Sequence, residues 1–139
     1  MRVLIDTNII IDAVCEREPF SDAAKDLLLL CASEEIEGYI SAKSIIDIRY
    51  IAKKYIHNEE EARYIINVLV DFLSVVDLTN EDCINAIFSN YKDYEDAVLI
   101  ECAKRNDIDI IVTRNLKDFT QTSIKVMNSN DLVSALVTK

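Results

Sequence analysis

The chain has 139 residues, half of them hydrophobic, and carries a formal net charge of −10. This length fits one domain with a sizeable core, and the hydrophobic fraction argues against a disordered protein. No apolar run approaches the ~20 residues of a membrane-spanning helix, and the first residues lack the pattern of a secretion signal. We therefore expect a single cytoplasmic domain over residues 1–139 that does not enter a membrane.

Histidine and glycine are scarce, which excludes several common classes of enzyme. His57 is the only histidine; this excludes zinc hydrolases with an H-E-x-x-H motif and argues against a serine or cysteine nucleophile paired with histidine. Gly38 is the only glycine, so the chain has neither a P-loop nor a G-x-G-x-x-G dinucleotide turn. The four cysteines form no C-x-x-C pair and are expected to be reduced core residues: Cys15, Cys31, Cys83 and Cys102.

The first part of the chain alternates between strand and helix patterns. Ser21 is placed to cap a helix that runs to about Ser33. In chain order we expect a strand at 2–6, continued core at 9–11, a helix at 21–33, a short strand at 38–41 and a helix at 44–55 with one apolar face.

The same alternation continues to the end of the chain. Asn58 is expected to cap a long helix to about Leu73, because the glutamates that follow it favour the positive end of a helix. We then expect a strand at 74–77, a helix opened by Thr79 or Asn80, a helix from Asp93 to Arg105, strands at 108–112 and 124–127, and a closing helix capped by Asn130. Strands separated by helices predict an α/β fold of three layers, with a mostly parallel sheet of about five strands between helices.

Asp6 interrupts the most hydrophobic part of the chain. It follows the apolar residues Val3–Ile5 and precedes a second apolar block, Ile9–Ile11. Ligands of parallel α/β sheets bind outside the carboxyl ends of the strands. We therefore expect Asp6 at a functional edge of the sheet, although an acid in this position can also serve only as a turn former.

Further polar residues occupy comparable positions at strand ends and helix starts. Asp47 interrupts an apolar helix, where it either faces a site or pairs with Lys43 or Lys54. Asp93 and Asp96 begin a helix, either as a capping box or as residues of a site. The strand at 108–112 is followed by Thr113, Arg114, Asn115 and Asp118. Four other acids are expected to face solvent: Asp12, Asp22, Asp26 and Glu95.

Acids gathered at one edge of a sheet need a cation. Carboxylates a few ångströms apart repel and raise one another's pKa values. Mg²⁺ and Mn²⁺ resolve this because they prefer oxygen ligands. Such an ion activates a water molecule for attack on a phosphodiester, and a second ion ~3.5–4 Å away stabilises the leaving oxygen. The composition therefore favours metal-activated water over a protein nucleophile.

Three stretches of the sequence together resemble a PIN domain, and in particular the VapC-type toxin ribonucleases of toxin–antitoxin pairs. They are DTN at Asp6–Asn8, ISAKSIIDIRYI around Asp47, and DYEDAVLIECAKRNDIDIIVTRNLKDF from Asp93 to Phe119. The resemblance covers essentially the whole chain. It implies a parallel sheet of order 3-2-1-4-5, a Mg²⁺- or Mn²⁺-dependent endoribonuclease (a hydrolase), a homodimer, and inhibition by an antitoxin protein.

The resemblance also implies roles for individual residues. Asp6 and Asp96 correspond to metal-binding acids of the family, and Asp47 stands where the family usually has a glutamate. Asn115 stands where many members carry a fourth acid; either its amide binds the metal or Asp118 compensates. The implied catalytic residues are thus Asp6, Asp47, Asp96 and Asp118, and the implied metal ligands are Asp6, Asp47, Asp96 and Asn115. The implied supporting residues are Asn8, Thr113 and Asp93.

RNA binding must be reconciled with the acidic charge. Two Mg²⁺ ions would change the net charge from −10 to −6, so basic residues must be concentrated near the site. The expected phosphate-binding residues are Lys43, Arg49, Lys53 and Arg114. A basic antitoxin segment entering the acidic cleft would suit the charge better than RNA does. The alternative is a catalytically silent PIN module that binds RNA or a protein, which Asp47 and Asn115 favour because both depart from the family pattern.

Overall fold

The computed structural model describes residues 1–119 and 122–138, and in these residues five parallel strands form one sheet. The order across the sheet is β3-β2-β1-β4-β5, so the first strand is central. The strands are β1 Arg2–Ile5, β2 Glu37–Ser41, β3 Ser74–Val76, β4 Ile110–Val112 and β5 Lys125–Met127. The predicted parallel sheet and its order 3-2-1-4-5 are confirmed.

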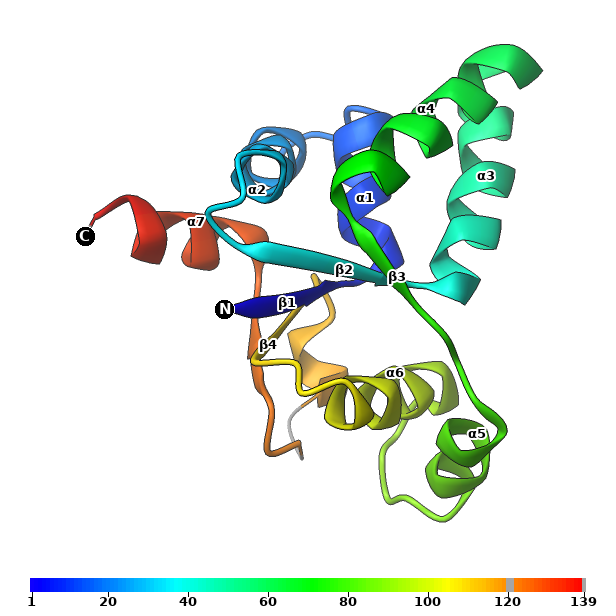
Figure 1. Cartoon of the computed structure of the whole chain (residues 1–139), viewed down its shortest axis with the longest axis vertical. Helices are drawn as coiled ribbons and strands as arrows, with labels where there is room; N and C mark the ends of the chain where they lie inside the picture. The colour runs from blue at the N-terminus through cyan, green and yellow to red at the C-terminus, as the bar shows by residue number, and fades with distance from the viewer. Residues whose placement is uncertain (120–121, 139) are drawn as a thin grey trace.

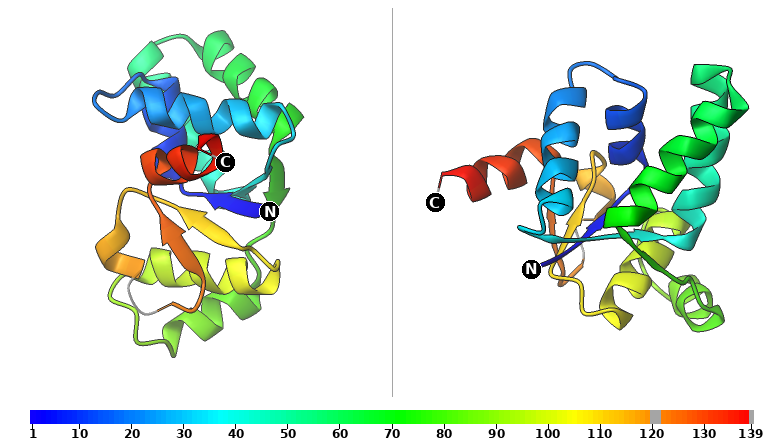
Figure 2. Two further views of the ribbon diagram at one scale, coloured as in Figure 1. Left: turned by 90° about the vertical axis from the view of Figure 1, so that its left-hand side faces the viewer. Right: turned by 45° about the horizontal axis from the view of Figure 1, so that its top comes forward.

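Helices cover both faces of this sheet (Figure 1). Most of them lie on one face, with α7 beside α2, whereas α5 and α6 cover the other face (Figure 2). The helices are α1 Thr7–Val14, α2 Ser21–Ala32, α3 Ala42–Ile56, α4 Glu59–Phe72, α5 Asn80–Ile87, α6 Tyr94–Arg105 and α7 Ser129–Val137, with a short 3₁₀ helix, η1, at Leu116–Phe119. The structure therefore has the expected three layers.

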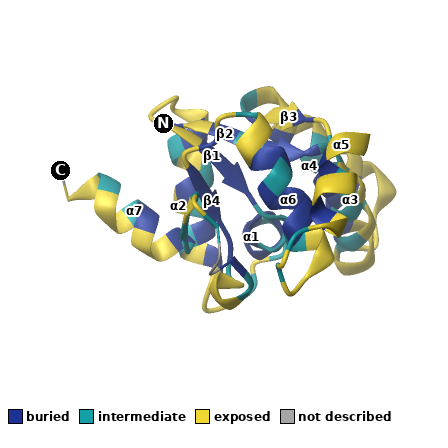
Figure 3. Cartoon of the chain, turned by 90° about the horizontal axis from the view of Figure 1, so that it is seen from below, coloured by how far each residue is buried: buried dark blue, intermediate teal, exposed yellow. Residues whose placement is uncertain are grey.

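The central strand divides its side chains between two cores. Val3 and Ile5 pack under α1–α4, whereas Leu4 packs with Ile111 and Ile100 on the opposite face. All five of these side chains are fully buried, and Figure 3 shows the strands at the centre of the fold coloured mainly as buried. Burial on both faces explains why β1 and β4 are hydrophobic without alternation.

Several helix starts differ from those that the sequence predicted. Ile9–Ile11 belong to a helix, α1, whereas the sequence predicted only a continued core there. The predicted caps at Ser21 and Asn130 are wrong. Phe20 precedes α2 without a side-chain cap, and Asn128 caps α7 by accepting a hydrogen bond from the Asp131 N–H at 2.8 Å. The position of a cap depends on where the chain turns into the helix, and polar residues next to that turn cannot be told apart from local sequence alone.

The caps at Asn58, Thr79 and Asp93 are confirmed. Thr79 forms a capping box with Asp82, so it is the cap of α5, and Asn80 is the first helical residue. The four cysteines are free thiols; Cys31 and Cys102 are buried, as predicted, whereas Cys15 and Cys83 are only partly buried. In the described part of the chain, no helix combines the length and the apolar character that crossing a membrane would require.

Candidate metal centre

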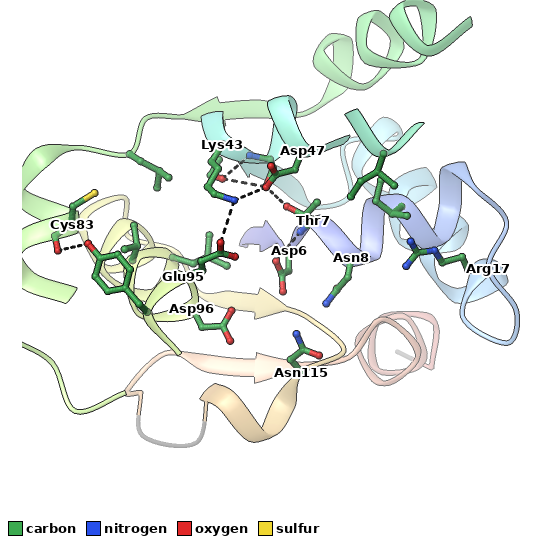
Figure 4. Close-up of a pocket in the computed structure, with 18 residues that line it drawn as sticks. Asp6, Thr7, Asn8, Arg17, Lys43, Asp47, Cys83, Glu95, Asp96 and Asn115 are labelled. Carbon is green, nitrogen blue, oxygen red and sulfur yellow. Dashed lines mark hydrogen bonds and ion pairs between the residues drawn. The ribbon is translucent and has the colours of Figure 1, made fainter. Parts of the chain in front are cut away.

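A cavity of about 540 Å³ opens at the carboxyl end of the sheet (Figure 4). Its walls come from the turn after β1, from α3 and from the start of α6, with Asn115 after β4. The polar side chains that line it include Asp6, Asn8, Arg17, Lys43, Asp47, Glu95, Asp96 and Asn115. Segments distant in the sequence thus meet at one edge because parallel strands end there together.

Asp6 is held in a fixed orientation at this edge. It caps α1, and its Oδ1 accepts the Thr7 N–H at 2.8 Å. Its Oδ2 accepts the hydroxyl of the fully buried Thr113 at 2.7 Å. Burial raises the pKa of Asp6, and the hydrogen bonds from Thr113 and Thr7 partly oppose that rise. Thr113, which was predicted to be a supporting residue, therefore contacts Asp6 directly.

Asp96 lies in the first turn of α6 and faces the cavity (Figure 4). Asp93 caps this helix by accepting the Asp96 N–H at 3.0 Å. Burial raises the pKa of Asp96 to about 7, and the charges of Asp93, Asp6, Asp118 and Glu95 add to the rise. Asp96 therefore lies in a concentration of negative charge.

Asp47 has a different environment although it lines the same cavity. The Lys43 ammonium donates to Asp47 Oδ2 at 2.6 Å and lies 3.8 Å from Glu95 on α6. The hydrogen bond with Asp47 raises the pKa of Lys43. Of the two predicted lysine partners of Asp47, the structure selects Lys43, since the Lys54 ammonium lies over the Tyr50 ring instead.

The loop after β4 brings two candidates for the fourth ligand toward the cavity. Asn115 lines the cavity, and its backbone N–H donates to Thr113 Oγ1 at 3.1 Å. Asp118 follows in η1, where its N–H donates to the Asn115 carbonyl at 3.0 Å, and its charge raises the pKa of Asp96. Both residues are therefore near the site.

All four predicted phosphate-binding residues are paired with acids of this chain. Arg49 and Lys53 both contact Glu59 at the start of α4, with Lys53 Nζ 2.9 Å from Glu59 Oε2. Arg114 Nε lies 2.7 Å from Asp12 Oδ2, and its guanidinium lies 4.4 Å from the Phe20 ring centroid. Lys43 is paired with Asp47, and of the four residues it is the one that lines the cavity.

Two contacts at the site were not foreseen from the sequence. Asp12 was expected to face solvent, which is wrong, because it is fully buried and pairs with Arg114. The omission of α1 caused the error, since a helix places Asp12 one turn after Asn8, on its inner side. The hydroxyls of Thr7 and Ser44 lie 2.7 Å apart and connect the start of α1 to α3.

The residues at this edge suit a hard divalent cation in chemical type. Carboxylate and amide oxygens are the ligands that Mg²⁺ and Mn²⁺ prefer. Asn8 Oδ1 is buried and lacks a hydrogen-bond partner, so the site has an unsatisfied acceptor. Over residues 1–119 and 122–138, no three His, Cys, Asp or Glu side chains are already gathered round one metal position. The donor types fit, and the donors are spread round the cavity.

The sequence matches the PIN domain family over residues 2–117. The chain therefore belongs to the PIN domain family. No curated protein sequence matches it.

The fold is similar to those of several solved toxin–antitoxin proteins. A toxin–antitoxin complex from Klebsiella pneumoniae is similar with a TM-score of 0.66 and 26% identity, over 91% of this chain and 97% of that chain. VapBC-1 from nontypeable Haemophilus influenzae gives a TM-score of 0.67 and 17% identity, over 94% and 99%. The sarcin-ricin-loop-cleaving toxin VapC20 of Mycobacterium tuberculosis gives 0.61 and 12%, over 78% and 86%.

Proposed function

We propose that this protein is a divalent-metal-dependent endoribonuclease and the toxin of a toxin–antitoxin pair. The observation that carries the proposal is the crowding of carboxylates round Asp96, where burial and then the charges of the neighbouring acids raise its pKa to about 7. Keeping these acids together opposes their mutual repulsion, and a bound cation would relieve it. Membership of the PIN domain family and the likeness to toxin–antitoxin structures support the same function.

Mg²⁺ or Mn²⁺ is the proposed cofactor. Asp6 and Asp96 would hold it, with Asp47 and either Asn115 or Asp118 completing the donor set. Once bound, the ion supplies an activated water molecule and stabilises negative charge on the phosphate. RNA is the proposed substrate, in keeping with the sarcin-ricin-loop cleavage named for VapC20.

The protein's own groups prepare the site for this chemistry. Thr113 and the Thr7 N–H fix both oxygens of Asp6, so its remaining lone pairs have a defined direction. Asp93 fixes the first turn of α6 and thereby the backbone position of Asp96. Lys43 carries a positive charge at the edge of the cavity, where a phosphate of the substrate would need one.

A catalytically silent PIN module that binds RNA or a protein is the second candidate. The observation in its favour is the 2.6 Å ion pair between Lys43 and Asp47, which occupies an acid that a metal would use. Asn115 in place of an acid also favours the silent module, because an amide adds no negative charge to attract a metal ion.

Metal titration with RNA cleavage separates the two candidates. Mn²⁺ or Mg²⁺ is expected to raise the melting temperature of the wild-type protein, and cleavage of single-stranded RNA is expected only with metal present. Asp96→Asn should lose both effects while remaining folded by circular dichroism. Asp26→Asn is the control, because Asp26 is an exposed acid of α2 and its loss changes the charge equally.

Each outcome identifies one candidate. Stabilisation and cleavage that are lost in Asp96→Asn and kept in Asp26→Asn support the nuclease. RNA or protein binding without metal stabilisation or cleavage would favour the silent module.

We also propose an antitoxin partner and a homodimer. Light scattering after gel filtration measures the homodimer directly, and co-purification with the product of the neighbouring reading frame tests the antitoxin.

A further inference from the structure

The cavity extends away from the acids to an arginine that the proposed chemistry does not use. Arg17 follows α1 and lines the end of the cavity beyond Asn8 (Figure 4). The other end is lined by Asp6, Glu95 and Asp96. One cavity therefore joins an acidic end to an end that carries a guanidinium.

Arg17 lies against an exposed aromatic ring. Its Cζ is 5.3 Å from the centroid of the Tyr55 ring, and its Nη2 donates to the Tyr55 hydroxyl at 3.4 Å. The Arg17 Nε is buried without a hydrogen-bond partner, and no carboxylate of residues 1–119 and 122–138 forms an ion pair with this guanidinium. Tyr55 is 56% exposed. Arg17 therefore keeps donors for a further anionic group beside an accessible ring.

The ring lies at the end of a stripe along α3. Lys43, Asp47, Ile51 and Tyr55 follow one another at intervals of four residues, so each is a neighbour of the next and the row winds slowly round the helix. The first three of these residues line the cavity. Twelve residues of helix rise about 18 Å, so the stripe leads from the acidic end of the cavity out to Tyr55.

This helix is also the basic element of an acidic chain. It contains Lys43, Arg49, Lys53 and Lys54 against one acid, Asp47, and over the described residues no other helix has a net positive charge. Its outer surface carries a second pair of cation and aromatic ring, because Lys54 Nζ lies 4.7 Å from the centroid of the Tyr50 ring, which is 60% exposed. Of these cations, Lys54 is the one without a carboxylate partner among the described residues, so α3 offers a polyanion one unpaired cation beside an exposed ring.

We propose that Arg17 and Tyr55 form a subsite for a nucleotide of single-stranded RNA next to the phosphodiester at the acidic end of the cavity. The guanidinium binds the flanking phosphate, and the ring stacks on the base, the combination by which proteins hold single strands without reading sequence. The inference rests on the proposed function, since it assumes RNA in the cavity. RNA suits this end better than an acidic protein segment, because a base needs the exposed face of the ring and a carboxylate does not.

The test compares a decamer RNA with a trimer that contains the same cleaved bond. Tyr55→Leu and Arg17→Gln are expected to lower the preference for the decamer, measured as the ratio of kcat/KM values, by about tenfold. Tyr55→Phe keeps the ring and should keep the preference. The controls are Tyr64→Leu and Arg63→Gln, two exposed residues of α4, of which Tyr64 is 67% exposed.

A second measurement does not depend on turnover. A decamer with 5-iodouridine at the flanking position is bound to Asp96→Asn protein and irradiated, and mass spectrometry locates the crosslink. A crosslink at Tyr55 supports the subsite, and crosslinks confined to other residues overturn it. Arg17→Gln should also reduce the salt dependence of binding by about one counterion.

The outcomes distinguish this inference from the proposed function. If wild-type protein cleaves neither RNA, the proposed function fails, and the crosslink still decides whether Tyr55 contacts RNA. If Tyr55→Leu matches Tyr64→Leu in its preference for the decamer, the subsite is overturned. The same holds if Tyr55→Leu weakens binding of a protein partner and leaves the decamer preference intact, because the surface then serves that partner.

Discussion

The two sides of the cavity treat charge in opposite ways. The floor, formed by Asp6 and Asp96, consists of carboxylates that are partly buried, and the pKa of each is raised. The wall, formed by α3, holds the exposed ion pair of Lys43 with Asp47. The floor therefore has charge that the protein leaves largely uncompensated, whereas the wall supplies its own cation.

Burial explains the difference. On the floor, desolvation is the largest cause of the raised pKa of Asp6 and of Asp96, because water is removed from the carboxyl groups. On the wall, solvent screens each charge, so an ion pair forms and breaks at little cost. A divalent cation would therefore stabilise the floor more than the wall. We accordingly expect Asp6 and Asp96 to contribute most of the metal affinity.

The largest expected contrast is in RNA cleavage. Asp6→Asn and Asp96→Asn should lower kcat/KM by about 1,000-fold, which corresponds to losing several kcal/mol of charge stabilisation. Asp47→Asn should lower it only about tenfold, because Lys43 already balances this acid. Single-turnover cleavage with saturating Mn²⁺ measures all three variants. Equal losses in the three would remove the distinction between floor and wall.

The next contrast is in stability. Arg114→Gln leaves the fully buried Asp12 without its partner and should lower the free energy of unfolding by about 3 kcal/mol. This is the low end of the range for broken buried pairs, because the Arg114 side chain is 29% exposed.

The matched variant on the wall is Arg49→Gln, which breaks the exposed contact with Glu59 and should leave the free energy of unfolding unchanged within error. Urea unfolding followed by circular dichroism compares the two variants. A loss in Arg49→Gln as large as that in Arg114→Gln would show that exposure does not separate the two regions.

The smallest effect concerns pH in the metal-free protein. The pKa of Asp96 rises from 3.8 to about 7 on folding, so the folded state holds this proton more tightly and stability falls as pH increases through that window. A shift of that size in a fully buried group is worth about 4 kcal/mol, and water round this partly exposed carboxyl reduces it to about 1–2 kcal/mol.

Asp96→Asn should therefore stabilise the metal-free protein at pH 8 and leave it nearly unchanged at pH 4. Thermal unfolding in EDTA across that range, compared with Asp26→Asn, isolates the contribution of Asp96 from the other acids. A stabilisation that is the same at both pH values would contradict the assignment of the raised pKa to Asp96.

Local patterns in the sequence predicted much of the fold. Uninterrupted apolar segments indicated buried parallel strands, and Asn58, Thr79 and Asp93 are caps because their side chains act within one turn of helix. Helix α1 was missed because its apolar block, Ile9–Ile11, fits a strand or a core helix equally well. That omission also placed Asp12 in solvent.

The sequence by itself determined which residue types can act here: hydrophobic strands that each end in a polar residue, acids at those ends, and neither a catalytic histidine pair nor a glycine-rich loop. Only the tertiary structure decided how those charges are compensated. It placed Arg114 on Asp12, Lys43 on Asp47, and other acids round Asp96. The physical reason is that an electrostatic interaction depends on distance and burial in space, and neither can be read from positions along the chain.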